Sequence, residues 1–158
     1  MAYAAWSVVF GEQPSAAKWN ILGTNDARFE SWITTDVRMK VGNFSITATG
    51  AKAITGVGFR PKVVEFHTYT GGNQSSSNLT IGHGAMDSSG NQFVHVGNVT
   101  EGGDASGGGA STGCLGSGDP NGGYDNLAAY TSMDSDGFTV NVTAYGGTSL
   151  SVGYIAYG

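Results

Sequence analysis

The sequence predicts an all-β protein: an antiparallel β-sandwich preceded by a short, partly helical N-terminal segment. From residue 43 onward, apolar and polar residues alternate with period two in several short runs, as in strands with one buried face. Turns rich in glycine separate these runs, and the chain has 27 glycines among its 158 residues. About seven short strands of this kind are typical of a sandwich. We therefore expect an N-terminal segment over residues 1–40 and a sandwich domain over residues 41–158.

The N-terminal segment has a helical pattern. Large apolar side chains recur at helical spacing after Ser15, and Pro14 fits the first turn of a helix. Gly23 makes two short helical pieces as good an interpretation as one. A short segment cannot bury this many large side chains alone, so we expect an anchor or an oligomer interface, the alternative being a helix packed on its own domain. The candidate interface residues are Trp6, Trp19, Leu22, Phe29, Trp32 and Ile33.

The first predicted strands carry the clearest alternation. Val64 and Phe66 alternate with Glu65 and His67, so one pair is expected to face the core and the other solvent. Gly50-Ala51-Lys52 is predicted to be a turn between the first two strands. The predicted strands in this half of the domain are Asn43–Thr49, the end of Ile54–Tyr69, Leu79–Met86 and Gln92–Gly97.

A long loop is predicted over Glu101–Asn126, because this stretch is rich in glycine and has no apolar period. It is interpreted either as a mobile surface insertion or as a segment held by a neighbouring subunit. It contains Cys114, the single cysteine, which excludes an intrachain disulfide and is expected to be a spectator thiol.

The C-terminal stretch predicts a hairpin. After a strand over Leu127–Met133, the residues Phe138–Ala144 alternate with apolar side chains on one face. Gly146-Gly147 offers a reversal without steric strain, and Ser149–Tyr157 alternates again. We expect these last two strands to pair with each other and to close the sheet.

Three short motifs carry a family resemblance. They are GF-x-PK-V at residues 58–63, S-D-GF-T-V-N-V at residues 135–142 and Y-I-A-Y-G at residues 154–158. In this order they resemble the H-type lectin domain and a related β-sandwich module of tailed-phage fibre and surface proteins, over roughly residues 43–158. The resemblance implies a homo-oligomer, most simply a trimer, and a sugar site at loop and strand ends between protomers.

The N-terminal wording resembles the N-termini of phage virion proteins, in which a short leader precedes an exposed β domain. The resemblance implies attachment to other virion proteins through this segment. The matching residues are Trp6, Gly11-Glu12, Pro14-Ser15-Ala16, Trp19-Asn20, Leu22 and Asn25-Asp26.

The charge and hydropathy of the chain exclude several functions. The net charge is −5 and only seven residues are Lys or Arg, which argues against nucleic-acid binding. No apolar stretch approaches the length of a membrane span, and Met1-Ala-Tyr-Ala lacks the features of a signal peptide. We expect synthesis in a host cytoplasm followed by assembly into a virion, with no membrane partner and no cofactor.

Candidate sugar-binding residues lie in or beside the two loops richest in polar and aromatic side chains. Aromatic faces stack on sugar rings, and planar amides and carboxylates bond to hydroxyls. The polarity of ordinary loops explains these residues equally well. The candidates are Tyr69, Asn73, Gln74, Tyr124, Asp125, Asn126 and Tyr130.

Metal binding and catalysis are not predicted. Three histidines, His67, His83 and His95, lie on three predicted strands and could converge with Asp87, but no pair has the close spacing of a specific metal site. Asp134-Ser-Asp136-Gly137 resembles the start of a calcium loop, yet the downstream bidentate Glu is missing and a turn is the better interpretation.

No nucleophile motif such as G-x-S-x-G occurs, so we do not expect an enzyme. A small hydrolase would have to depend on Glu65 or His67. The function expected from the sequence is a structural component of a phage virion, either a surface decoration or a short fibre protein, whose sandwich contacts the host surface or its glycans. The alternative is a soluble carbohydrate-binding lectin of the H-type class.

Overall fold

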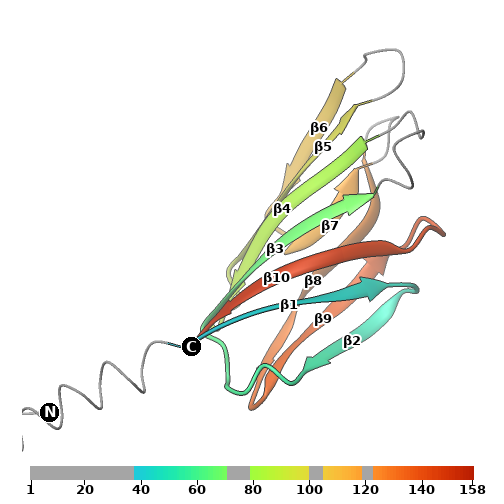
Figure 1. Ribbon diagram of the computed structural model, residues 1–158. Helices are drawn as coiled ribbons and strands as arrows, with labels where there is room; N and C mark the ends of the chain where they lie inside the picture. The colour runs from blue at the N-terminus through green and yellow to red at the C-terminus, as the bar shows by residue number, and fades with distance from the viewer. Residues whose placement is uncertain (1–37, 71–78, 100–104, 119–122) are drawn as a thin grey trace, which may run out of the picture. The chain divides into compact units, whose positions relative to one another are not determined.

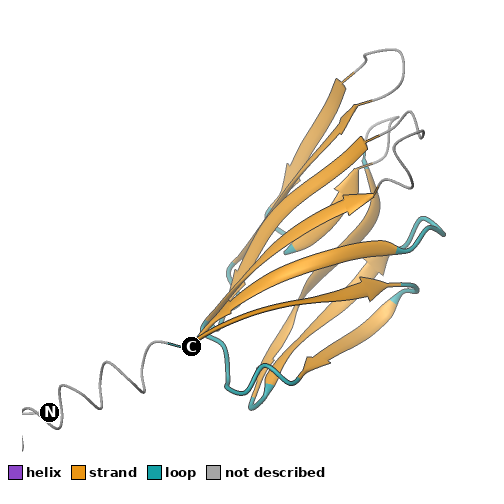
Figure 2. Cartoon of the chain, viewed as in Figure 1, coloured by secondary structure: helices purple, strands orange, loops and turns teal. Residues whose placement is uncertain are grey.

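The computed structural model describes residues 38–70, 79–99, 105–118 and 123–158. They form two antiparallel sheets that pack face to face, as in a β-sandwich (Figures 1 and 2). The all-β class and the antiparallel pairing predicted from sequence are confirmed. The predicted helical segment and its six candidate interface residues lie outside the described ranges. A helix able to cross a membrane is not found in the described part of the chain.

The larger sheet has six strands in the order β1–β10–β3–β4–β5–β6, and the smaller has four in the order β2–β9–β8–β7. The six strands are β1 (Met39–Ile46), β3 (Val63–Thr70), β4 (Leu79–Asp87), β5 (Gln92–Val99), β6 (Ala105–Ala110) and β10 (Leu150–Tyr157). The four strands are β2 (Gly50–Thr55), β7 (Leu115–Gly118), β8 (Tyr124–Asp134) and β9 (Gly137–Ala144).

Aromatic side chains join the two sheets in the core. The ring of Phe138 on β9 lies 5.6 Å from that of Phe66 on β3 and 5.2 Å from that of Tyr154 on β10, both in edge-to-face geometry. Such pairs contribute about 0.5–1.5 kcal/mol beyond the burial of their area. Phe66 and Phe138 are fully buried, as their alternation with polar neighbours predicts.

The predicted C-terminal hairpin is wrong. Strand β9 pairs with β2 and β8, whereas β10 pairs with β1 and β3 in the other sheet. The segment 145–149 therefore carries the chain across the core instead of reversing it within one sheet. Alternation specifies which face of a strand is apolar, and not which strand lies beside it. The apolar faces of β9 and β10 therefore meet each other across the core.

The prediction of a loop over Glu101–Asn126 is also wrong, because β6 and β7 lie within it. Cys114 and Leu115 are fully buried beside strand β8. Gly50-Ala51-Lys52, predicted to be a turn, begins strand β2, and the chain turns one step earlier, at residues 47–49. The predicted turn at Asp136 is confirmed, and its carboxylate accepts hydrogen bonds from the backbone N–H groups of Gly56 and Gly58, at 3.1 and 2.6 Å.

Close approach of the backbones explains how a strand as poor in large side chains as β7 is buried. A Cβ atom on Gly84 would collide with the carbonyl oxygens of Cys114 and Phe93, and one on Gly82 would collide with that of Gly116. The hydroxyl of Thr68 donates a hydrogen bond to the Gly116 carbonyl at 2.6 Å. Strand β7 thus packs on the backbone of β4 without needing an apolar period of its own.

Substituting Gly84 by alanine tests this close approach. We expect Gly84→Ala to lower the free energy of unfolding by about 3 kcal/mol, because the colliding atoms belong to the backbone and cannot rotate away. The matched variant Gly97→Ala, whose Cβ would meet Ile81 at an ordinary 3.7 Å, should change stability by less than about 0.5 kcal/mol. Urea denaturation measures both, and equal costs would contradict the packing of β7 on β4.

Labelling of Cys114 tests whether β7 belongs to the core. Burial raises the pKa of the Cys114 thiol to about 12, so the folded protein holds roughly a thousandfold less thiolate than an exposed cysteine. We expect no reaction with a thiol reagent at pH 8 during an hour in the native protein, and complete reaction in concentrated urea. Stoichiometric labelling of the native protein within minutes would place this segment in an open loop.

Candidate functional site

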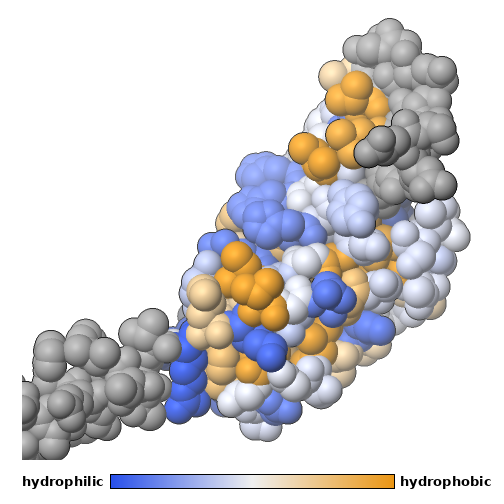
Figure 3. All heavy atoms as spheres, viewed as in Figure 1, coloured by the Kyte–Doolittle hydropathy of each residue, from blue (hydrophilic) through white to orange (hydrophobic). Residues whose placement is uncertain are grey.

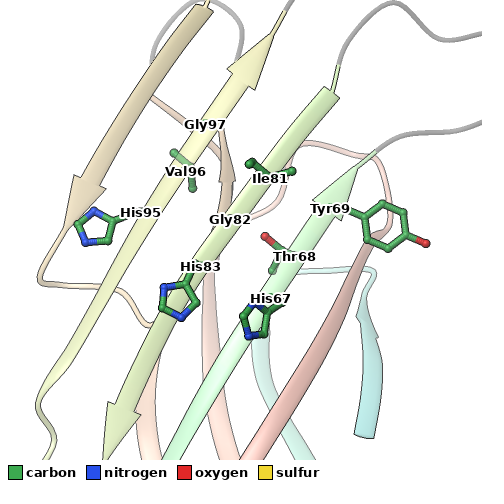
Figure 4. Close-up of a pocket in the computed structure, with 9 residues that line it drawn as sticks. All are labelled: His67, Thr68, Tyr69, Ile81, Gly82, His83, His95, Val96 and Gly97. Carbon is green, nitrogen blue, oxygen red and sulfur yellow. The ribbon is translucent and has the colours of Figure 1, made fainter. Parts of the chain in front are cut away.

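On the solvent-facing side of the six-stranded sheet, the pairing of β3, β4 and β5 aligns outward side chains in rows that run across the strands. His67 on β3 is directly opposite His83 on β4, and His83 is directly opposite His95 on β5. All three side chains are exposed. The three imidazoles therefore form one row across neighbouring strands (Figure 4). We call this the histidine row.

A solvent-open hollow of about 560 Å³ lies over the histidine row and over the next row of outward positions, Tyr69, Ile81 and Gly97. Gly97 on β5 is directly opposite Ile81 on β4, and its lack of a side chain leaves the space beside Ile81 open. Figure 4 shows the lining residues, which come from β3, β4 and β5. They are His67, Thr68, Tyr69, Ile81, Gly82, His83, His95, Val96 and Gly97.

Large hydrophobic side chains surround the histidine row. The exposed large hydrophobic residues that the structure describes all occupy outward positions of the six-stranded sheet and are between 39% and 63% exposed. They are Met39, Val41, Tyr69, Leu79, Ile81, Phe93 and Val99. Figure 3 shows hydrophobic residues in separate patches with hydrophilic residues between them. We call the solvent-facing side of the six-stranded sheet, with its outward side chains, the outer face.

The outer face carries little charge. The outward positions of β1, β10, β3, β4 and β5 include no Lys or Arg, and their carboxylates are Glu65 and Asp87. Asp87 ends β4 and accepts hydrogen bonds from the backbone N–H groups of Ser89 and Asn91. A further bond from the Asn91 side chain is the main reason that the pKa of Asp87 lies below its usual range. Asp87 therefore belongs to the β4–β5 turn. It does not join the histidines, although the sequence allowed it as a possible fourth ligand.

The carboxylate that lies beside the histidines is that of Glu65 and not that of Asp87. It lies two residues before His67 on the same face of β3. One ligand atom from each of Glu65, His67 and His83 can be chosen so that all three lie within 4.8 Å of one another. The rings of His67 and His83 are 5.0 Å apart, whereas the ring of His95 lies against Phe93 at 5.4 Å.

The candidate sugar-binding residues are divided between the two sheets. Tyr69 is 58% exposed and borders the hollow of the outer face. Tyr124, Asp125, Asn126 and Tyr130 all lie on β8, in the four-stranded sheet. Asn73 and Gln74 are outside the described residues.

On β8, only part of the predicted set is presented to solvent. Asp125 is exposed, but Asn126 is 1% exposed and its amide nitrogen donates a hydrogen bond to the Ser117 hydroxyl at 2.9 Å. The hydroxyl of Tyr124 is buried and has no hydrogen-bond partner among the described residues, and Tyr130 packs against the core. These side chains therefore do not form one binding surface with Tyr69.

The sequence contains a signal for the histidine row that strand patterns alone do not use. The turn at residues 88–91 places Met86 opposite Gln92, and the pairing that follows from it brings His83 opposite His95. The pairing of β3 with β4 that brings His67 opposite His83 is given by the structure, because the long connection between these strands does not fix their register in the sequence. Register about a turn, and not spacing along the chain, determines which residues share a site.

No protein-family model, curated protein or solved structure matches this chain.

Paired alanine variants distinguish the buried candidate from the exposed one. We expect Asn126→Ala to lower the free energy of unfolding by about 2 kcal/mol, because it opens a small cavity and removes the hydrogen bond to Ser117. Tyr69→Ala should cost less than about 1 kcal/mol, since its ring is exposed on a strand. Urea denaturation measures both. An Asn126→Ala protein as stable as the parent would contradict the structural role of this amide.

Proposed function

We propose that this chain is a structural component of a phage virion, a surface decoration or short fibre protein that works as a homotrimer. The observation that carries the proposal is the outer face, which presents seven large hydrophobic side chains among the described residues. The N-terminal resemblance to virion leaders supports attachment of the chain to other virion proteins. We assign no catalytic activity to it.

The outer face of each chain is covered by the outer faces of other copies of the chain. Exposed apolar patches bordered by polar residues are typical of surfaces that contact another protein, and the seven large apolar side chains lie on one face of one sheet. The chain has a net charge of −5, so copies repel one another except where their contact surfaces carry little charge. The outer face meets this condition, and depletion of charge together with enrichment in aromatic side chains is typical of the centre of an interface.

A closed trimer is the arrangement that this surface favours. Three sheets arranged about a threefold axis cover their outer faces together and leave no open end for further growth. The four-stranded sheets then face outward, where they are available to a host surface. The resemblance to the H-type lectin domain also implies subunits packed side by side in a trimer.

A second candidate function, glycan binding, is favoured by the place of Tyr69. This ring is exposed at the margin of a hollow lined by imidazoles, the kind of aromatic surface on which sugar rings stack. A soluble lectin would keep its sugar affinity and its trimer after removal of residues 1–37. A virion component would lose incorporation into particles. The cut belongs before Arg38, because β1 begins at Met39 and a later cut would remove part of the sheet.

A charged substitution at the centre of the outer face tests the assembly. We expect light scattering to give the mass of a trimer for the full chain and of a monomer for Ile81→Arg, because burying an unpaired guanidinium is costly. The control Asn141→Arg, at an exposed position of β9 in the other sheet, should remain a trimer.

Three results would count against this assignment. A monomeric full chain would remove the basis for the trimer. A trimeric Ile81→Arg protein that becomes monomeric after removal of residues 1–37 would place the association in the N-terminal segment. Loss of the trimer in Asn141→Arg would place it on the four-stranded sheet.

A further inference from the structure

We propose that Glu65, His67 and His83 form a binding site for a divalent transition-metal ion of the Zn²⁺ class on the outer face. This inference goes beyond the proposed assembly function and does not depend on it. It revises the expectation from sequence, in which no metal site is present.

The strand register brings the three ligands together. Glu65 and His67 are two residues apart on β3, so both point outward, and His83 is the direct partner of His67 on β4. Their ligand atoms lie within 4.8 Å of one another, whereas ligands of a tetrahedral zinc ion are about 3.3 Å apart. The two exposed imidazoles and the half-buried Glu65 carboxylate can close this difference by rotation about their χ angles, with the backbone unchanged.

The donor atoms match the ion. Imidazole nitrogen is a preferred ligand for zinc, copper and nickel, and one carboxylate added to two imidazoles gives a charge and geometry suited to zinc. Calcium and magnesium prefer sets made entirely of oxygen, so the site should discriminate against them. Three protein ligands leave a fourth position that is open to water or to a donor atom of a docked molecule.

The three side chains are free to bind an ion. None of them makes a hydrogen bond or ion pair with another residue that the structure describes, and the outward positions of the neighbouring strands carry no Lys or Arg to compete for Glu65. The Phe93 ring lies edge-on against the His83 ring, with 5.8 Å between the ring centroids. An apolar neighbour of this kind lowers the local dielectric constant, which strengthens attraction to the cation.

Titration of the full chain with Zn²⁺ alone tests the site. The protein should be purified without a histidine tag and treated with a chelator first. Isothermal calorimetry should then give one ion per chain with micromolar affinity, and Co²⁺ in place of Zn²⁺ should give the intense visible absorption of tetrahedral coordination. Mg²⁺ should not compete.

Matched variants identify the ligands. We expect His83→Asn, His67→Asn and Glu65→Gln each to weaken Zn²⁺ binding by about 10-fold or more, which is at least the effect of losing a supporting partner of a ligand. His95→Asn is the control, because His95 belongs to the same histidine row but lies outside the three-residue cluster, and it should bind Zn²⁺ as the parent does. All four substitutions are at outward positions, and unchanged urea midpoints would show that the fold is intact.

Four results would overturn the proposal. These are absence of Zn²⁺ binding to the full chain, unchanged affinity in both His83→Asn and Glu65→Gln, a loss in His95→Asn as large as that in His83→Asn, and a stoichiometry of half an ion per chain. The last would show a site shared between two copies instead of one completed within a chain. If the full chain is monomeric but binds one ion with these ligands, the metal site stands while the trimer does not.

Discussion

The register of strands β3, β4 and β5 is the constraint on which the rest of this structure depends. Because a shift of one residue would exchange the two faces of a strand, the same pairing that buries Phe66 fixes His67 on the outer face. It also aligns His67 with His83 and His83 with His95. The core and the candidate site are therefore two consequences of one hydrogen-bonding pattern.

The opposite face of the same strands shows a second consequence of this register. Gly82 and Gly84 point inward from β4 and admit the backbone of β7, while His83 between them points outward. The close packing of the two sheets makes the middle of β4 a rigid support for the exposed side chains. Rigid strands hold a binding site more accurately than loops do. This explains why a surface site can be defined on a domain whose connections are largely glycine and serine.

Much of the fold could be predicted from the sequence, because burial of alternate residues leaves a direct pattern in it. The inward side chains of β3, β9 and β10 are the predicted ones. Pairing could not be predicted in the same way: β9 and β10 have the pattern of a hairpin, but each has partners in a different sheet. Strands β6 and β7 leave no apolar period in the sequence, because β6 is a largely exposed edge strand and β7 is buried through backbone contact with β4. Among the site residues, Glu65 and His67 were noted as outward-facing, whereas their meeting with His83 required the register.

The most direct test of the account is a crystal structure of the full chain grown with Zn²⁺, with anomalous diffraction recorded at the zinc edge. We expect an anomalous peak between Glu65, His67 and His83, and copies of the chain related by a threefold axis with Ile81 and Phe93 buried between them. An outer face open to solvent in every copy, with no zinc peak at these three ligands, would contradict the account.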